Sequence, residues 1–205
     1  MVNPSLYDVV IERGKSPLND QIIDKIKQNI PRKKLITSSD PSSISNKYLD
    51  VGCNTGWLLE EVPYGVGIDN SKIIVSQALA KGLDVICHDV TMGLPFPDNS
   101  FNCVVLSCVL QQVSEPLELL WDAMRVARHK VIGVSPYPGM SEWGRINGNK
   151  WTKSVIWPDK LKEMFYAKIE EIDNTHYFFE IRVRNHSKMY PFKRKINAKF
   201  PLTSN

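Results

Sequence analysis

From residue 47 onward, short continuous runs of hydrophobic residues alternate with segments in which hydrophobic residues recur every three or four positions. The continuous runs are rich in β-branched residues, as is typical of strands buried on both faces of a parallel sheet. They span 47–52, 64–69, 84–89, 101–109 and 129–136. The periodic segments are typical of amphipathic helices, and they span 55–62, 71–82, 115–127 and 159–167. Two final strands are expected near 169–174 and 177–184, joined by the short turn "DNTH".

This alternation predicts an α/β fold with a Rossmann-like, seven-stranded, mostly parallel sheet, helices on both faces and an antiparallel hairpin at the sheet edge. Isoleucines at helical spacing in 17–30 predict one more helix, which precedes a serine-rich break at 38–46. We therefore expect one domain over 1–205. It would consist of an N-terminal helical cap (1–45), the Rossmann-like core (46–184) and a basic C-terminal tail (185–205).

Composition narrows the class of protein. With 42% hydrophobic and 23% charged residues, the chain suits one globular domain with a real core. No hydrophobic run reaches 18 residues and the N-terminus lacks a signal-like stretch, so neither a membrane span nor export is expected. The four cysteines form no C-x-x-C pair, which argues against a metal site or disulfides and favours the reducing cytoplasm.

The segment "YLDVGCNTGW" (48–57) predicts a strand, a glycine-containing turn and a helix, an arrangement that usually holds a nucleotide-like ligand. A phosphate-binding P-loop needs a lysine after its second glycine, but Trp57 follows Gly56. A dinucleotide fingerprint needs glycines at its first, third and sixth positions, and here Asn54 and Trp57 occupy two of them. Both of these ligand classes fit the turn poorly.

The remaining pattern is an acid, Asp50, two residues before Gly52, with Gly56 four positions further on. It resembles motif I of the class I (Rossmann-like) S-adenosylmethionine-dependent methyltransferases. An acid at the strand end suits the ammonium of the methionine end of that cofactor, and glycines let the backbone approach the ligand closely. Asn54 replaces a more frequent glycine, but asparagine tolerates left-handed backbone angles.

Acids also end the next two predicted strands. Asp69, 19 residues after Asp50, is placed to accept both ribose hydroxyls. The resemblance implies that Asp89 binds the adenine amino group and that the backbone N–H of Val90 reaches an adenine ring nitrogen. Together with the motif IV-like segment "LPFPDNSFNCVVLSCVLQQV", these acids predict an S-adenosylmethionine site formed by Asp50, Gly52, Asn54, Gly56, Asp69, Asn70, Asp89, Val90 and Ser107.

Over 47–145 the chain is most similar to the methionine-biosynthesis protein W (MetW-like) group of this superfamily. The similarity rests on "LDVGCNTGWLL", on "GLDVICHDVTMGLPFPDNSF" and on "VSPYPGMSEWGR". It implies a link to homoserine acylation in methionine synthesis, with an unidentified methyl acceptor. We expect Gln111, Tyr137, Trp143 and Arg145 to line the acceptor pocket, and no residue is an obvious catalytic base. Tyr7, in a further N-terminal segment, is a candidate for covering the cofactor.

Three functions remain open. The leading one is a cytoplasmic methyltransferase, and the second is a non-catalytic, cofactor-binding adapter or regulator of a partner enzyme. The third is an RNA methyltransferase that uses the seven basic residues between Arg182 and Lys199, a stretch without acids. A solvated tail explains that stretch better, so nucleic acid is a less favoured partner.

Overall fold

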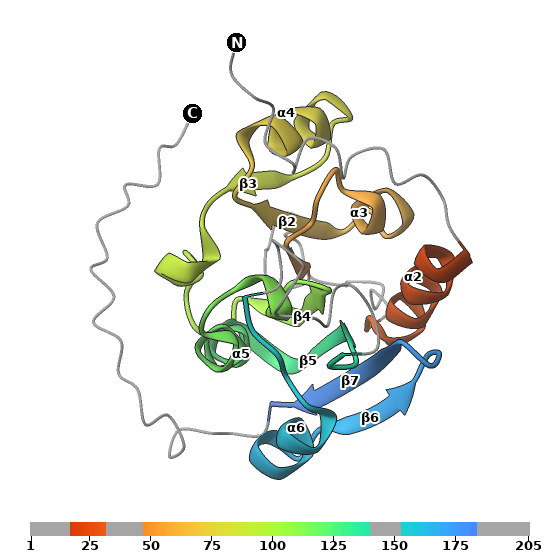
Figure 1. Ribbon diagram of the computed structural model, residues 1–205. Helices are drawn as coiled ribbons and strands as arrows, with labels where there is room; N and C mark the ends of the chain where they lie inside the picture. The colour runs from red at the N-terminus through yellow and green to blue at the C-terminus, as the bar shows by residue number, and fades with distance from the viewer. Residues whose placement is uncertain (1–16, 32–46, 140–152, 184–205) are drawn as a thin grey trace.

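The computed structural model describes residues 17–31, 47–139 and 153–183. Within them, seven strands form one sheet (Figure 1): β1 (Tyr48–Val51), β2 (Gly65–Asp69), β3 (Val85–Cys87), β4 (Phe101–Ser107), β5 (Ala127–Pro136), β6 (Lys168–Glu171) and β7 (His176–Arg182). The helices are α2 (Pro17–Asn29), α3 (Trp57–Glu61), α4 (Lys72–Ala80), α5 (Pro116–Val126) and α6 (Pro158–Phe165). Two short 3₁₀ turns, η2 (Val90–Met92) and η3 (Leu110–Gln112), follow β3 and β4.

The strand order is β3-β2-β1-β4-β5-β7-β6. The pairs from β3 to β5 are parallel, and β7 runs antiparallel to both β5 and β6. The predicted seven-stranded, mostly parallel sheet with an antiparallel edge hairpin is therefore confirmed. The order reverses between β1 and β4, and ligands of such sheets bind at that switch point, beyond the carboxyl ends of the strands.

Helices cover both faces of the sheet, as the alternation of elements predicts (Figure 1). On one face, α5 and α6 pack through Leu120 and Leu161 onto a core that includes Leu106 and Phe179. On the other face, α2, α3 and α4 bury a second cluster, in which Ile26 of α2 packs with strand residues. Burial of both faces explains why the strands read as continuous hydrophobic runs instead of alternating ones.

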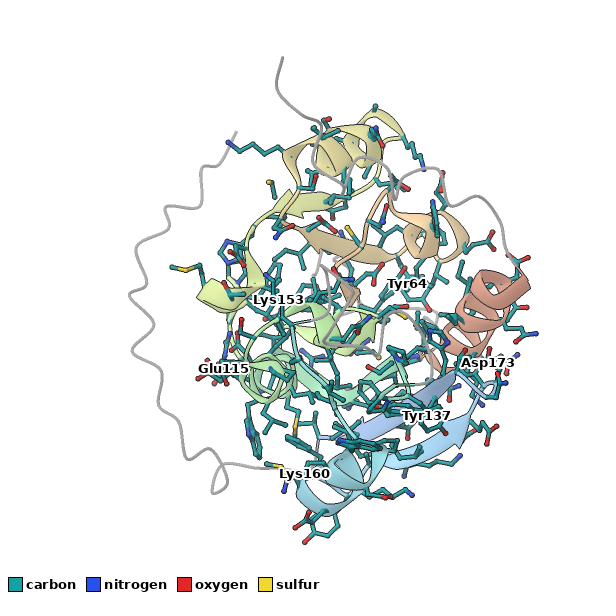
Figure 2. The ribbon with its side chains drawn as sticks, in the orientation of Figure 1. Tyr64, Glu115, Tyr137, Lys153, Lys160 and Asp173 are labelled. Atoms are coloured by element: carbon teal, nitrogen blue, oxygen red, sulfur yellow. The ribbon has the colours of Figure 1, made fainter. Side chains whose placement is uncertain are left out.

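The hairpin turn between β6 and β7 depends on one side chain, Asp173 (Figure 2). Its Oδ1 accepts hydrogen bonds from Thr175 N at 2.8 Å, from Thr175 Oγ1 at 2.8 Å and from His176 N at 2.7 Å. An aspartate that bonds the backbone two or three residues ahead mimics a turn and fixes the reversal of the chain. The "DNTH" sequence thus sets the position of the edge hairpin.

Most element boundaries lie one to three residues from those predicted, and two of these shifts are next to the proposed site residues. The first helix after β1 begins at Trp57 instead of residue 55, because Gly56 is still in the left-handed conformation, with φ of 85°. Strand β3 ends at Cys87, two residues before Asp89, because the chain turns there into η2. In the part of the chain that the structure describes, no helix is long and hydrophobic enough to cross a membrane.

Candidate functional site

The turn after β1 takes the shape that its glycines and asparagine allow. Gly52, Asn54 and Gly56 have φ angles of 73°, 52° and 85°, all in the left-handed region. The backbone N–H groups of Gly52 and Cys53 donate to the carbonyl of Ile68 at 2.8 and 3.1 Å, which ties the turn to the end of β2. The prediction that Asn54 tolerates a left-handed backbone is confirmed.

Gly56 is needed for space as well as for its backbone angle. A Cβ at this position would lie 2.3 Å from Cδ1 of Leu83, whereas a Cβ at Gly82, with a similar φ of 76°, would meet nothing within 4 Å. We expect Gly56→Ala to lower the free energy of unfolding by about 2–3 kcal/mol and Gly82→Ala by about 1 kcal/mol. Urea denaturation of both variants measures the difference. Equal losses would show that the contact with Leu83 has no cost.

Asp69, the last residue of β2, joins the turns that follow β1 and β2. Its Oδ2 accepts a hydrogen bond from Asn54 N at 3.1 Å, and its Oδ1 accepts one from Ser71 N at 3.0 Å. The side chain is buried, and burial raises its pKa, although hydrogen bonds from the backbone of Ser71, Asn54 and Asn70 oppose the rise. The Asp69 carboxylate is therefore fixed in place by the backbone before any ligand arrives.

Asp50 lies on β1, between Gly67 of β2 and Val105 of β4. Its residue is only 4% exposed, and burial, followed by the negative charge of Asp69, raises the pKa of its carboxyl to about 7. Among the described residues, no hydrogen-bond donor contacts this carboxylate. A buried acid without a donor or a cation is costly, so this position favours a ligand that brings a positive charge.

The third predicted acid, Asp89, sits in a different environment from the first two. It is exposed and caps η2, where its Oδ1 accepts hydrogen bonds from Thr91 N at 2.9 Å and Thr91 Oγ1 at 2.8 Å. These bonds, with a smaller contribution from the charge of Lys153, lower its pKa. The half-buried Val90 follows it and packs against the hydrophobic core that α5 and α6 share with the sheet.

The turn after β4 lies directly against the turn after β1. A Cβ at Gly52 would come within 2.9 Å of Cγ2 of Val109. Between the half-buried Ser107 and Val109, Cys108 has a φ of 53°, which strains a residue that is not glycine. Neither Val109 nor Cys108 is among the site residues predicted from the sequence. Only the position of this turn after the switch-point strand signals its role.

Two glutamines hold the strained residue in place. The Nε2 groups of Gln111 and Gln112 both donate to the carbonyl oxygen of Cys108, each at 2.8 Å. Gln111 is only 4% exposed, and its Oε1 is buried without a hydrogen-bond partner among the described residues. Such an oxygen is uncommon in a folded protein, because leaving a buried acceptor unpaired costs about 1–3 kcal/mol.

Of the remaining predicted pocket residues, Tyr137 is the one that lies in the part of the chain the structure describes. Tyr137 follows β5 and packs on β7, with its ring centroid 5.1 Å from that of Tyr177. Trp143 and Arg145 lie outside the described residues, as do Tyr7 and the basic tail 185–205. The roles of these residues stay predictions. The described residues contain no group of three histidines, cysteines or acids that could hold a metal ion.

Comparisons with known proteins agree with this geometry. The chain is 33% identical over 100 residues to a bifunctional methionine biosynthesis protein MetXA/MetW of Rhodopirellula baltica, a match that covers 41% of this chain and 16% of that protein. It is also 32% identical over 104 residues to a demethylmenaquinone methyltransferase of Renibacterium salmoninarum, covering 47% and 43% of the two chains. The chain therefore spans less than half the length of these relatives.

Solved structures share the fold at low sequence identity. An S-adenosylmethionine-dependent methyltransferase of Aquifex aeolicus superposes with a TM-score of 0.60 at 17% identity, covering 90% of this chain and 100% of that one. A methyltransferase of Thermotoga maritima superposes with a TM-score of 0.61 at 13% identity, covering 80% and 88%. The fold is that of the class I S-adenosylmethionine-dependent methyltransferases. Because the family model "Methionine biosynthesis protein MetW" matches residues 39–147, more than half of the chain, this protein belongs to the MetW family.

Proposed function

We propose that this protein binds S-adenosylmethionine and transfers its methyl group to an acceptor. The observation that carries the proposal is the buried carboxylate of Asp50, to which no described residue donates a hydrogen bond, beside the fixed carboxylate of Asp69. The methionine end of S-adenosylmethionine carries an ammonium group, whose positive charge would stabilise the buried carboxylate of Asp50. The family and the fold favour the same ligand.

In this proposal each part of the site has one role. Asp50 pairs with the ammonium group, and Asp69, whose carboxylate is held by backbone N–H groups, accepts the ribose hydroxyls. Gly52 and Gly56 give the turn its left-handed backbone and leave space for the side chains of Val109 and Leu83. Residues at the carboxyl ends of β1 to β4 complete the proposed site: Asn54, Asn70, Asp89, Val90 and Ser107.

The bound cofactor supplies a methyl group on a positively charged sulfur, which is already a good electrophile. The residues of this chain then have to exclude water and hold the acceptor opposite the departing sulfur. Holding two reactants in line lowers the reaction barrier by up to about 7–11 kcal/mol in intramolecular models.

Cys108, the cysteine next to this site, is not a catalytic base, since burial raises the pKa of its thiol to about 12. The four cysteines are free, which suits a protein of the reducing cytoplasm.

A second candidate function is a cofactor-binding adapter or regulator of a partner enzyme. The observation that favours it is the Rhodopirellula baltica relative, in which a MetW-like part shares one chain with MetXA.

The two functions differ in whether the protein transfers the methyl group of the bound cofactor. The protein is incubated with S-adenosylmethionine labelled in its methyl group and a bacterial metabolite extract, and label in any product is measured against Asp69→Ala as the blank. Label transfer supports the enzyme, whereas cofactor binding without transfer supports the adapter.

A further inference from the structure

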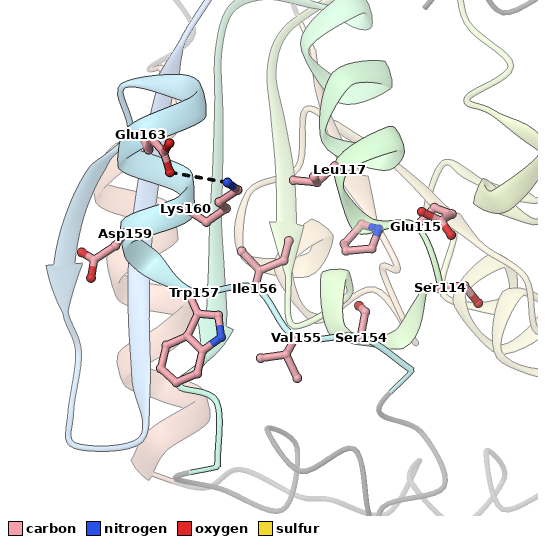
Figure 3. A pocket seen from close by; sticks show the side chains of 11 residues that line it. Ser114, Glu115, Leu117, Ser154, Val155, Ile156, Trp157, Asp159, Lys160 and Glu163 are labelled. Atoms are coloured by element: carbon pink, nitrogen blue, oxygen red, sulfur yellow. Dashed lines mark hydrogen bonds and ion pairs between the residues drawn. The ribbon is translucent and has the colours of Figure 1, made fainter.

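A groove opens at the carboxyl edge of the sheet, where helices α5 and α6 begin (Figure 3). Its volume is about 580 Å³, within the range of small-molecule sites. Figure 3 shows Leu117 of α5, Ile156 and Trp157 around it, with Lys160 and Glu163 on α6. Trp157 is 60% exposed, which is unusual for so large a hydrophobic side chain.

The groove is joined to the turn after β4. The backbone N–H groups of Lys153 and Ser154 donate to the carbonyl of Gln111 at 2.8 and 3.3 Å, and Ser154 Oγ donates to the carbonyl of Leu110 at 3.0 Å. Ser154 also lines the groove. Gln111, whose Oε1 is buried and unpaired among the described residues, is therefore bonded through its main chain to a residue of the groove on one side. On the other side, Val109 reaches the proposed cofactor turn at Gly52.

Acidic side chains outnumber basic ones around the groove. Glu115, Asp159 and Glu163 line it, with Lys160 as the one basic lining residue among those described. Lys160 pairs with Glu163 at 3.4 Å, and Asp159 pairs with Lys162 at 3.2 Å. Glu115 forms no ion pair with a described residue, although as the residue directly before α5 it also offsets the positive end of that helix. A carboxylate beside an exposed indole suits a ligand that carries an amino group.

We propose that the methyl acceptor is an amine, that an N–H of its attacking nitrogen donates to Gln111 Oε1, and that the rest of the molecule lies in the groove between α5 and α6. This inference rests on the proposed function. The orientation of the Gln111 amide is set by its Nε2 bond to Cys108, so its oxygen can only accept a hydrogen bond. A carboxylate acceptor has no N–H or O–H to offer that oxygen, and a tertiary amine has none either.

The reaction balances without a general base. The nitrogen lone pair of the neutral amine forms the N–C bond while the C–S bond breaks, and its electron pair goes to sulfur. The positive charge moves from the sulfonium to the methylated nitrogen, whose N–H remains bonded to Gln111 Oε1. The proton leaves to water after the product departs. A fixed oxygen that meets this developing charge stabilises the transition state more than the neutral amine.

The test uses a bacterial metabolite extract in two portions. One portion is treated with formaldehyde and cyanoborohydride, which converts primary and secondary amines to tertiary amines without N–H groups. Methyl-labelled S-adenosylmethionine and the protein are added to both. We expect at least tenfold less label to enter products in the treated portion. Equal labelling of the two portions would overturn the inference, and so would cofactor binding without labelling of either portion. If the protein does not bind S-adenosylmethionine at all, that result instead contradicts the proposed function.

Two variants separate the role of Gln111 from that of the turn. Gln111→Leu and Gln112→Leu each remove one hydrogen bond to the Cys108 carbonyl, but only the first removes the unpaired oxygen. With the amine that the extract assay identifies as the methyl acceptor, we expect Gln111→Leu to lower kcat/KM about 10- to 100-fold and Gln112→Leu less than threefold. The dissociation constant of S-adenosylmethionine should stay unchanged in both. Equal losses in the two variants would contradict the assignment.

The groove is tested in the same assay. Glu115→Gln is expected to raise KM about three- to tenfold with little change in kcat, since it removes an attraction made before the reaction. The matched control is Glu118→Gln, which changes an exposed acid of the same helix that does not line the groove. Equal KM values for the two variants would show that the groove does not bind the acceptor.

Discussion

Asp50→Asn is expected to stabilise the ligand-free protein at pH 8 by about 2–4 kcal/mol. The carboxyl of Asp50 has a pKa of about 7 in the folded protein, against an ordinary value of 3.8. At about 1.4 kcal/mol for each tenfold change in proton affinity, burial of the carboxylate costs at most about 4 kcal/mol. An asparagine has no charge to bury, and its amide loses a smaller part of its solvation.

The sign of the pH dependence follows from the same pKa. Between pH 4 and 7 the unfolded chain has lost the Asp50 proton and the folded protein still holds it, so folding is less favourable as pH rises. Urea denaturation at pH 5 and pH 8 should therefore show that wild-type stability falls over this range by more than that of Asp50→Asn. Asp24→Asn, at an exposed acid of α2, is the control and should keep the wild-type slope. A variant less stable than wild type at pH 8 would contradict the expectation.

The same variant is expected to bind S-adenosylmethionine at least tenfold more weakly than wild type, because it cannot pair with the ammonium group as an anion. Wild-type affinity should also rise from pH 6 to pH 8 as Asp50 ionises, with proton release on binding at pH 6. Calorimetry in two buffers of different ionisation enthalpy measures that release. Affinity that is independent of pH would show that Asp50 does not contact the ligand's charge.

Asp69→Ala is expected to weaken S-adenosylmethionine binding by at least 30-fold, or about 2 kcal/mol. The change removes a carboxylate acceptor for two ribose hydroxyls, and hydrogen bonds to a charged group are worth about 1.5–3 kcal/mol each. It also leaves the N–H groups of Asn54 and Ser71 without their acceptor, which loosens the turn.

Calorimetric titration of Asp69→Ala beside Asp24→Ala gives the measurement and its control. The control should bind as wild type does, because Asp24 is an exposed residue of α2. Circular dichroism establishes that both variants fold. If folded Asp69→Ala binds S-adenosylmethionine with wild-type affinity, Asp69 does not contact the ligand.

Sequence patterns predicted the sheet well because both of its faces are buried. Continuous hydrophobic strands, amphipathic helices and the Asp173 turn all carry local signals, and each matches an observed element. Boundaries were less predictable where a turn competes with a regular element. At Gly56 the left-handed backbone delays the helix, and at Asp89 a capping side chain follows a strand that has already ended.

The site was predictable only where the residue type itself signals chemistry. The acids and glycines of the first turn stand out in the sequence, and the structure places Asp50, Gly52, Asn54 and Asp69 together. The contact between Val109 and Gly52 could not be predicted, because it joins residues more than 50 positions apart. The unpaired oxygen of Gln111 has no sequence signature either, since it arises from burial and from the direction of one amide.

The most direct test of the central claim is calorimetric titration of the wild-type protein with S-adenosylmethionine and S-adenosylhomocysteine at pH 8. We expect one site per chain for each ligand, with a dissociation constant in the micromolar range or below. We also expect S-adenosylhomocysteine to compete with S-adenosylmethionine for that site. Absence of binding for both ligands at millimolar concentration would contradict the account.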